Sequence, residues 1–309
     1  MPKVTVVGAG NVGSNTARNI AEQDLADEVV MVDVVEGLPQ GLALDINHSA
    51  AVKGFDSKVI GSNDYQATEG SDVTVITAGK ARQPGMSRMD LLEQNSEIMR
   101  GVVESIVESS SDTIIIVVSN PLDEMTYLAS EVSGFPKERV MGMAGVLDSS
   151  RLRFFIAEKL DVPPTKVDAL TLGSHGDQMV ALPRHAKVEG KPLVDLVDED
   201  TLSDLFERTK NAGAEIVEHL KKGSAYYAPS ASAAAMVKAI LDDSNEVLPT
   251  CAWTTGQYGI SDVYLGVPAK LGKGGVAEIV ELDLTDQERE ALEEAAEAIR
   301  SKCRELSGS

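Results

Sequence analysis

The chain has 309 residues, of which 43% are hydrophobic and 25% charged. This is the ordinary composition of a folded globular protein, and it excludes a disordered, collagen-like or coiled-coil chain. Lysine and arginine number 28 against 49 aspartates and glutamates, so the formal net charge is −21. A field of that sign repels phosphate backbones and anionic lipid, which argues against binding nucleic acid or a membrane surface. We interpret the excess as a solvated acidic surface, such as a salt-rich cytoplasm favours.

Two cysteines, Cys251 and Cys303, have neither the number nor the spacing of a disulfide framework or a metal site. We therefore expect two thiols in a reducing compartment and no bound metal. The N-terminus enters a strand-like run without a targeting segment, and no apolar run approaches the roughly 18 residues of a membrane span. These features predict a soluble cytoplasmic protein.

The first half of the chain alternates short β-branched runs with longer helical segments. The runs are too short for helices and too continuous for half-exposed strands, which is typical of strands buried on both faces of a parallel sheet. Strand–helix alternation of this kind predicts a Rossmann-type doubly wound α/β sheet. We expect strands over residues 4–7, 29–34, 73–77 and 114–119, and helices over 12–22, 38–50 and 88–109.

The pattern changes after about Gly142. We therefore expect two domains, a Rossmann domain over 1–142 and a mixed α+β catalytic domain over 143–309. In the last segment Thr285, followed three residues later by Glu288, has the spacing of a helix capping box. The other elements expected here are helices over 147–159, 201–221 and 231–242, and strands over 167–172, 247–254, 263–267 and 277–280.

A glycine-rich motif directly follows the first expected strand and opens a helix. In Gly8-Ala9-Gly10-Asn11-Val12-Gly13, Gly8 would make the tight turn and Gly10 would let the backbone approach a pyrophosphate. Gly13 would let the helix pack closely on the strand, and the helix N-terminus would face the pyrophosphate charge. Asp33 follows twenty residues after Gly13 and would accept hydrogen bonds from ribose hydroxyls. The motif predicts a dinucleotide site that prefers NAD to NADP, the alternative being a tight turn without a ligand.

Two further segments carry polar groups at the expected carboxyl edge of the sheet. The connection over 77–88 is long, rich in Gly and Pro, and holds three cations, among them Arg82 and Arg88. We interpret it as a mobile loop that grips an anion, although a solvated loop would have a similar composition. Asn120 ends the strand over 114–119, at the edge where ligands bind in open α/β sheets, although a turn residue before Pro121 is an equal explanation.

A third group of polar residues falls in the second half. Asp148 and Arg151 are three residues apart and therefore share a helical face, where a plain surface ion pair is also an ordinary arrangement. His175 lies in the turn Gly173-Ser174-His175-Gly176 directly after an expected strand. Of the four histidines, it alone has glycine neighbours that let a ligand approach closely. These residues are the candidates for acid–base chemistry.

Taken together and in this order, these motifs closely resemble those of the lactate/malate dehydrogenases over nearly the whole chain. The loop Arg82-Gln83-Pro84-Gly85-Met86-Ser87-Arg88 is similar to that of malate dehydrogenases, since lactate dehydrogenases place a glutamine where this chain has Arg82. The segment Val146–Arg151 is similar to the bacterial and archaeal malate dehydrogenases built on a lactate-dehydrogenase-like scaffold.

The resemblance implies a catalytic role for each candidate. His175 would exchange a proton with the C2 oxygen of the substrate, and Asp148 would hold the imidazole and favour its protonated form. Arg151 would grip the C1 carboxylate in a bidentate fork. The remaining substrate residues would be Arg88 and Asn120 at the C2 oxygen and Arg82 at the distal carboxylate, so that a four-carbon dicarboxylate is selected.

The resemblance also implies a set of cofactor residues, the partners and the setting. The reaction expected is the reversible NAD-dependent oxidation of (S)-malate to oxaloacetate in the tricarboxylic acid cycle, by a homo-oligomer that is more often a tetramer than a dimer. A cis peptide bond is expected between Asn120 and Pro121. The residues expected to bind NAD are Gly8, Gly10, Asn11, Val12, Gly13, Asp33, Thr77, Ala78, Gly79, Asn95, Val118, Asn120 and Pro229.

Three alternatives remain open at this point. A lactate dehydrogenase or a broad 2-hydroxyacid dehydrogenase is the nearest, and Arg82 argues against it. An NAD-dependent glycosidase on a related fold would use a divalent metal, for which the sequence has no Cys/His cluster. A non-enzymatic NAD sensor would need the Gly8 motif but would have no use for His175 and Arg151 together.

Overall fold

The computed structural model of the chain describes residues 2–80 and 88–307, which form two compact units. Unit 1 comprises Met1–Met143, Tyr226–Glu246 and Lys270–Glu278. Unit 2 comprises Ala144–Ala225, Val247–Ala269 and Ile279–Ser309. The chain therefore leaves unit 1 after residue 143 and returns to it twice. The simpler division by chain order, 1–142 and 143–309, stays a prediction.

Unit 1 is built on a parallel sheet of six strands in the order β3-β2-β1-β4-β5-β6. This is the doubly wound order, in which the direction of strand addition reverses between β1 and β4. The Rossmann-type sheet predicted from the sequence is thereby confirmed. The strands are β1 (Lys3–Val7), β2 (Glu28–Val32), β3 (Lys58–Ser62), β4 (Val73–Ile76), β5 (Ile114–Val117) and β6 (Val140–Gly142).

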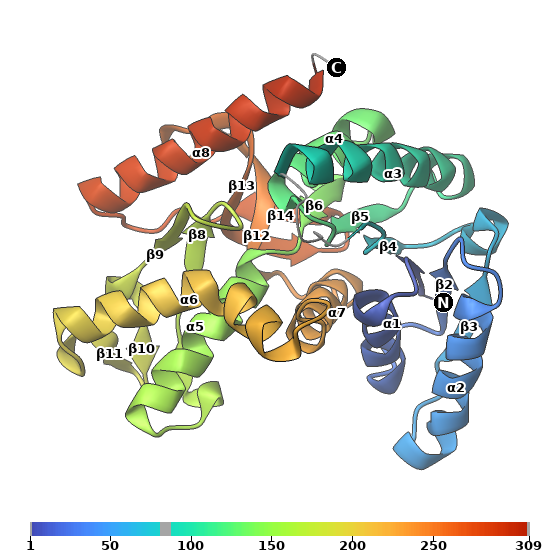
Figure 1. The fold of residues 1–309 in the computed structure, drawn as a ribbon, viewed down its shortest axis with the longest axis horizontal. Helices are drawn as coiled ribbons and strands as arrows, with labels where there is room; N and C mark the ends of the chain where they lie inside the picture. Colours follow the sequence, from blue (N-terminus) through green and yellow to red (C-terminus); the bar gives the residue numbers. More distant parts are fainter. Residues whose placement is uncertain (1, 81–87, 308–309) are drawn as a thin grey trace. The chain divides into compact units, whose positions relative to one another are not determined.

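Helices cover both faces of this sheet (Figure 1). On one face α1 packs against α7, and α2 packs against β3. On the other face α3 packs against α4. Burial on both faces explains why β1, β4 and β5 are nearly unbroken runs of β-branched residues. The helices are α1 (Asn11–Glu22), α2 (Leu38–Lys53), α3 (Arg88–Ser109), α4 (Leu122–Ser133) and α7 (Tyr227–Leu241).

The predicted elements of unit 1 agree with the structure to within a few residues. The helix expected over 88–109 is α3 at the same bounds. The strand expected over 29–34 ends earlier, at Val32, so that Asp33 stands directly after β2 instead of within it. Helix α7 begins at Tyr227 where we expected residue 231, because Pro229 fits the first helical turn and is no barrier there.

Unit 2 packs helices against antiparallel strands. In its main sheet the order is β12-β13-β8-β9, and α8 packs on β8 and β9. A three-stranded sheet, β11-β10-β7, encloses a separate core with α5 and α6. The elements are α5 (Gly145–Leu160), β7 (Val167–Asp168), β8 (Thr171–Gly173), β9 (Met179–Ala181), β10 (Lys187–Val188), β11 (Lys191–Pro192), α6 (Glu199–Leu220), β12 (Glu246–Thr255), β13 (Ser261–Gly272) and α8 (Asp286–Ser307). Strand β14 (Gly275–Ile279) pairs with β13 and belongs to unit 1 except for its last residue.

The single strand expected over 167–172 is wrong. The segment divides into β7 and β8, which belong to different sheets. Val167 packs into the core beside α5 and α6, whereas Thr171 pairs with Ala181 in the main sheet. The segment reads Val-Asp-Ala-Leu-Thr-Leu, and this short mixture of apolar and polar residues does not reveal that its two ends pair in different sheets.

The predicted start of the last helix is confirmed. The amide of Thr285 donates to Glu288 Oε2 at 2.8 Å, and the amide of Glu288 donates to Thr285 Oγ1 at 3.1 Å. This reciprocal pair is the capping box expected from the spacing. The predicted apolar face of the helix is buried, at Leu292, Ala296, Ile299, Cys303 and Leu306.

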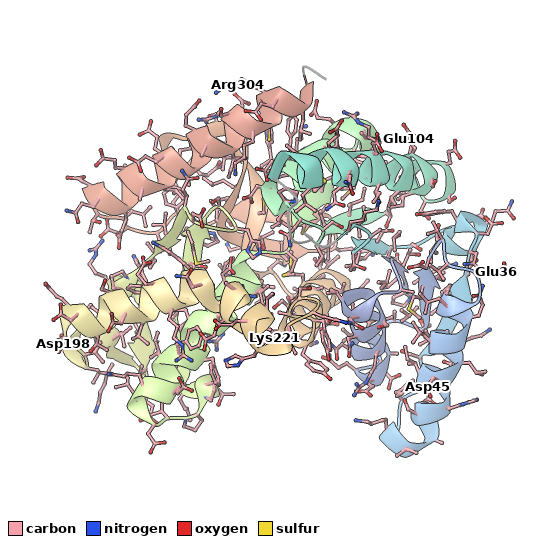
Figure 2. All side chains as sticks on the ribbon, viewed as in Figure 1. Glu36, Asp45, Glu104, Asp198, Lys221 and Arg304 are labelled. Atoms are coloured by element: carbon pink, nitrogen blue, oxygen red, sulfur yellow. The ribbon has the colours of Figure 1, made fainter. Side chains whose placement is uncertain are left out.

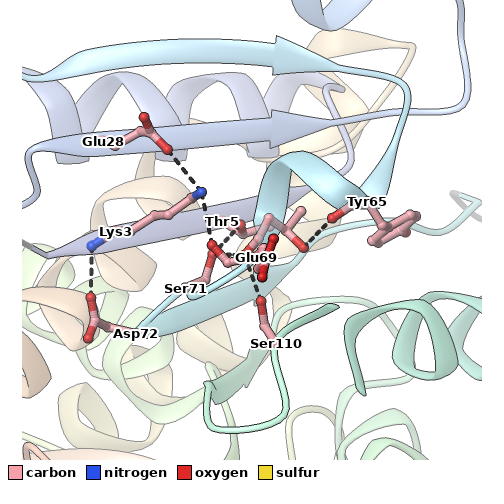
Figure 3. A network of polar contacts seen from close by, with 9 residues as sticks. Lys3, Thr5, Glu28, Tyr65, Glu69, Ser71, Asp72 and Ser110 are labelled. Atoms are coloured by element: carbon pink, nitrogen blue, oxygen red, sulfur yellow. Dashed lines mark hydrogen bonds and ion pairs between the residues drawn. The ribbon is translucent and has the colours of Figure 1, made fainter. Parts of the chain in front are cut away.

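A network of polar contacts joins the amino ends of the unit 1 strands (Figure 3). Lys3 begins β1; its Nζ lies 3.0 Å from Glu28 Oε1, and its backbone amide donates to Asp72 Oδ2 at 2.8 Å. In the interior the hydroxyls of Thr5 and Ser71 share a hydrogen bond of 2.7 Å. Ligands bind at the opposite, carboxyl edge of such sheets. We therefore interpret this network as stabilising the fold and not as part of a binding site.

The surface carries much of the negative charge. Figure 2 shows Glu36, Asp45 and Glu104 in unit 1 and Asp198 in unit 2, and all four are exposed. Over the ranges 2–80 and 88–307, no helix is both long enough and apolar enough to cross a membrane. Cys251 and Cys303 are buried and are not joined by a disulfide.

Candidate active site

The glycine-rich turn after β1 has the close backbone packing that the motif predicts. Gly8 has φ +99°, a conformation that side chains disfavour. A Cβ on Gly13 would lie 1.8 Å from the carbonyl oxygen of Gly8, so no other residue fits there without moving the backbone. Thr77 closes the turn from β4, since its Oγ1 donates to Val7 O at 3.0 Å. The turn thus lies at the point where the sheet order reverses.

Asp33 is held rigidly beside this turn. Its Oδ2 accepts from the amide of Ala9 at 2.6 Å, and its Oδ1 accepts from the amide of Val35 at 2.9 Å. Each oxygen keeps further lone-pair capacity, which is what a pair of ribose hydroxyls requires. The charge of Asp33 also acts on Tyr65, whose pKa burial and this carboxylate together raise to about 12.

The N-terminus of α1 suits a pyrophosphate. The helix is capped by Gly10, which has no side chain to accept from the first-turn amides. Among the described residues, no heavy atom lies within 4 Å of the position a Cβ on Gly10 would take. Backbone amides and the positive end of the helix dipole therefore border an open space. The residues present thus fit a dinucleotide cofactor.

The expected cofactor residues Thr77, Ala78 and Gly79 follow β4, at the same edge of the sheet. Ser119, which the sequence analysis left out of the site, fixes this segment: its Oγ donates to Ala78 O at 2.6 Å. Val118 lies beside it, and its amide donates to Ile76 O at 2.9 Å. A serine that ends a buried strand was the only sequence signal for this contact.

Asn95, which is expected to bind NAD, makes several hydrogen bonds within the protein. Its Oδ1 accepts from the amide of Lys80 at 2.8 Å, and its Nδ2 donates to Lys80 O at 3.2 Å and Asn120 O at 2.6 Å. Both amide hydrogens are thus used within the protein. Asn95 thus connects Lys80, in the loop after β4, to Asn120. Any hydrogen bond that Asn95 makes with a cofactor can use only Oδ1.

The structure does not describe the side chains of the two loop arginines, Arg82 and Arg88. Arg82 lies outside the described residues. Arg88 is the first residue of α3, and its side chain is likewise not described. The peptide bond between Asn120 and Pro121 is cis, as the resemblance implied.

In unit 2 two of the remaining candidates, His175 and Arg151, contact the carboxylate of the third, Asp148. His175 Nδ1 lies 2.8 Å from Asp148 Oδ2, and Arg151 Nη1 lies 3.2 Å from Asp148 Oδ1. The Asp148 side chain is 3% exposed, so this is a buried cluster and the surface ion pair that we kept as an alternative is excluded. With Nδ1 facing the carboxylate, the neutral ring carries its hydrogen on Nδ1 and its lone pair on Nε2.

Arg151 has more donors than the protein satisfies. Its side chain is 14% exposed, and its Nε is buried without a hydrogen-bond partner among the described residues. Gly213 of α6 faces the guanidinium, since a Cβ at that position would lie 3.7 Å from Nη2. A buried, under-satisfied guanidinium is a costly arrangement unless an anion completes it.

A serine next to Asp148 links this helix to the strand that precedes His175. Ser149 Oγ accepts from the amide of Thr171 at 3.0 Å and lies 3.4 Å from Thr171 Oγ1. Both residues are buried. Neither residue was predicted to belong to the site, because no local spacing relates residues 22 positions apart.

The expected cofactor residue Pro229 lies in the first turn of α7 and is buried. The next residue, Ser230, donates through Oγ to Val12 O at 2.9 Å and also contacts Tyr226 O. Because Val12 belongs to the glycine-rich motif, this hydroxyl fixes the start of α7 to the cofactor turn. In the described ranges no group of three or more His, Cys, Asp or Glu side chains could hold a metal.

Comparison with known protein families assigns both halves of the chain to one family. Residues 2–142 match the NAD binding domain of lactate/malate dehydrogenase, and residues 145–307 match the alpha/beta C-terminal domain of the same enzymes. The chain belongs to the lactate/malate dehydrogenase family. The family is one of NAD-dependent oxidoreductases, and NAD is the cofactor of its first domain.

Individual relatives cover almost the whole chain. A malate dehydrogenase of Salinibacter ruber is 55% identical over 304 residues, which is 98% of this chain and 96% of the relative. A crystal structure of the Salinibacter ruber enzyme superposes with a TM-score of 0.95 at 52% identity, covering 99% of this chain and 97% of that one. A lactate dehydrogenase of Cryptosporidium parvum, complexed with lactic acid and the cofactor, superposes with a TM-score of 0.96 at 40% identity, covering 100% and 98%.

Proposed function

We propose that this protein is an NAD-dependent malate dehydrogenase, which interconverts (S)-malate and oxaloacetate. The curated relatives that are about half identical over nearly the full length are malate dehydrogenases. The observation that carries the chemistry is the buried cluster in which His175 and Arg151 contact opposite oxygens of Asp148.

His175 is the proton acceptor in malate oxidation. The C2 hydroxyl of malate gives its proton to Nε2, and the resulting imidazolium is stabilised by Asp148 on the opposite ring nitrogen. In the reverse direction His175 returns that proton to the C2 oxygen of oxaloacetate. Asp148 thus keeps one tautomer of the ring and one orientation. Bound NAD supplies the acceptor, and in its reduced form the donor, of the hydride.

Arg151 holds the C1 carboxylate. Its planar guanidinium can donate two parallel hydrogen bonds to a carboxylate, a geometry that lysine cannot reproduce. The hydrogen bond from Arg151 Nη1 to Asp148 orients the guanidinium before the substrate arrives. In this proposal Asn120 and Arg88 donate to the C2 oxygen, where negative charge develops during reduction of the ketone.

Arg82 selects the dicarboxylate. Pairing with the distal carboxylate gives charge-assisted hydrogen bonds, whereas pyruvate would leave the guanidinium without a partner in a closed site. The cofactor residues proposed are those of the glycine-rich turn, Asp33 and the segments after β4 and β5. Asp33 favours NAD because its charge repels a 2′-phosphate.

A lactate dehydrogenase is the second candidate, and the fold does not decide between the two. The malate and the lactate dehydrogenase of Cryptosporidium parvum are each 40% identical to this chain with a TM-score of 0.96. Arg82 is the feature that favours malate. A sensor without catalysis is disfavoured by the cost of burying the Asp148–His175–Arg151 cluster for no chemistry.

The test is steady-state turnover of oxaloacetate beside pyruvate, with NADH and then with NADPH. The wild type is expected to prefer oxaloacetate and NADH. In Arg82→Gln we expect kcat/KM for oxaloacetate to fall about 10²–10³-fold and turnover of pyruvate to rise, from the loss of roughly 2–4 kcal/mol of paired charge. Arg100→Gln removes an exposed cation from α3 and is the matched control. Unchanged oxaloacetate turnover in Arg82→Gln would refute the assignment.

We further propose a homotetramer, with a dimer as the less favoured state, acting in the cytoplasm within the tricarboxylic acid cycle. Support for assembly comes from α2, which exposes Leu44 by 57% and Val52 by 86% although it packs against β3. Large apolar side chains on one helix are typical of an interface. The acidic surface is proposed to be an adaptation to salt, and stability that did not rise with salt concentration would count against it.

A further inference from the structure

Strand β8 carries His175 toward Asp148, and its position in the sheet is well determined. Thr171 and Gly173 pair with Ala181 and Met179 of β9, and Gly173 also pairs with Gly266 of β13. A Cβ on Gly266 would lie 2.4 Å from Gly173 O, so the two backbones are in close contact. These contacts fix β8 within the plane of its sheet. They do not by themselves fix its distance from α5, which lies against it.

A hydrogen bond of Ser149 links β8 to α5. The amide of Thr171 donates to Ser149 Oγ at 3.0 Å, and the two hydroxyl oxygens are 3.4 Å apart. Ser149 is the residue after Asp148 on α5, and Thr171 lies four residues before His175. The bond therefore connects α5, which holds Asp148, to β8, which precedes His175. It lies close in the chain to the contact of 2.8 Å between His175 Nδ1 and Asp148 Oδ2.

We propose that Ser149 is a positioning residue, which sets the contact between Asp148 and His175 by holding β8 against α5. The inference rests on the proposed malate dehydrogenase function, because it concerns the proton-transfer pair of that reaction. Charge-assisted hydrogen bonds are short and weaken steeply with distance and angle. A displacement of β8 by a fraction of an ångström therefore changes how well Asp148 stabilises the imidazolium.

Removal of the hydroxyl has a definite consequence. In Ser149→Ala the buried amide of Thr171 loses its acceptor, and the strand must move or admit water to satisfy it. Among the described residues, Asp148 contacts the ring, Arg151 contacts the same carboxylate, and Asp177 lies two positions from His175 in the chain. The substitution changes none of these charged side chains. Any change in the protonation of His175 would then arise from position alone.

The experiment measures the pH dependence of kcat/KM for oxaloacetate reduction, which requires protonated His175. For Ser149→Ala we expect kcat to fall about tenfold and the alkaline limb of the profile to move to lower pH by about half a unit or more, since the imidazolium is less well stabilised. The dissociation constant of NADH, measured by fluorescence, is expected to stay within about twofold. Ser149→Thr keeps the hydroxyl and is expected to restore the wild-type limb.

Ser150→Ala is the matched control. Ser150 is the next residue of α5, and its Oγ donates to Leu147 O of its own helix at 2.6 Å, so it makes no link to β8. Its pH profile is expected to equal that of the wild type. If Ser149→Ala does not fold, Ser149→Cys supplies a weaker acceptor of similar size, and a smaller shift in the same direction is expected.

The outcomes distinguish a failure of the proposed function from a failure of the positioning role of Ser149. If the wild type does not turn over oxaloacetate with NADH, the proposed function fails. If the wild type is active and the alkaline limb of Ser149→Ala or Ser149→Cys coincides with it, the positioning role is overturned, even where kcat or stability has fallen. An equal shift in Ser150→Ala would overturn it as well.

Discussion

The cofactor turn of unit 1 and the acid–base pair of unit 2 reach their geometry by different means. The turn at Gly8–Gly13 is made of backbone, and its shape depends on side chains being absent. The Asp148–His175 pair is made of a side chain on α5 and a side chain in the turn after β8, and its shape depends on hydrogen bonds between these two segments. The first should therefore be sensitive to added atoms and the second to removed ones.

The largest effect is expected where a reacting group is removed. His175→Ala should lower malate oxidation about 10²–10⁴-fold, the usual contribution of a general acid–base group. NADH affinity should be unchanged, because the cofactor turn belongs to other residues. His219→Ala on α6, an exposed histidine, is the control. Equal activity in both variants would remove His175 from the mechanism, and lost NADH affinity would show that cofactor binding depends on His175.

Added atoms should damage the cofactor turn in two distinguishable ways. A methyl group on Gly13 meets Gly8 O, so Gly13→Ala should lose both thermal stability and at least about tenfold in NADH affinity. Gly10→Ala meets no described atom, and should lose affinity while stability is kept. Gly101→Ala, in an exposed part of α3, controls for glycine in a helix. Calorimetry and fluorescence titration measure the two quantities; Gly13→Ala with wild-type values of both would contradict the close packing.

The smallest effect concerns the charge of Asp33. The folded protein raises the pKa of Tyr65 to about 12 from an ordinary value of 10.0, through burial and this carboxylate. The neutral phenol is thus favoured by folding. Its contribution to stability is complete below pH 10 and is lost as the pH rises toward 12.

Two measurements check this expectation. The free energy of unfolding of the wild type, compared with that of Tyr65→Phe, should decline between pH 10 and 12. In Asp33→Asn the phenol should titrate at lower pH by ultraviolet absorbance. If the phenol titrates near pH 10 in the wild type, Asp33 and the burial of Tyr65 do not act as described.

Local patterns predicted much of the fold and of the site. Runs of β-branched residues indicated the sheet, and the Thr285–Glu288 spacing indicated a cap that the structure contains. The glycine motif and the i, i+3 spacing of Asp148 and Arg151 are also local signals. His175 was found because glycine neighbours mark a turn.

The rest depends on contacts between distant residues. The bonds of Ser149 with Thr171, and of Asn95 with Lys80 and Asn120, join residues 15 to 25 positions apart that no periodicity relates. The return of α7 to unit 1 and the division of 167–172 into two strands have the same cause. Both depend on which distant part of the protein each segment packs against. Packing between segments that are distant in the sequence leaves no local pattern from which it could be predicted.

The central claim is that His175 and Arg151 act on one small dicarboxylate in the presence of reduced cofactor. The most direct measurement is a crystal structure with NADH and tartronate, an unreactive substrate mimic. The account predicts one tartronate carboxylate in the fork of Arg151 and the tartronate hydroxyl within hydrogen-bond distance of His175 Nε2. Tartronate bound at full occupancy away from both side chains would contradict it.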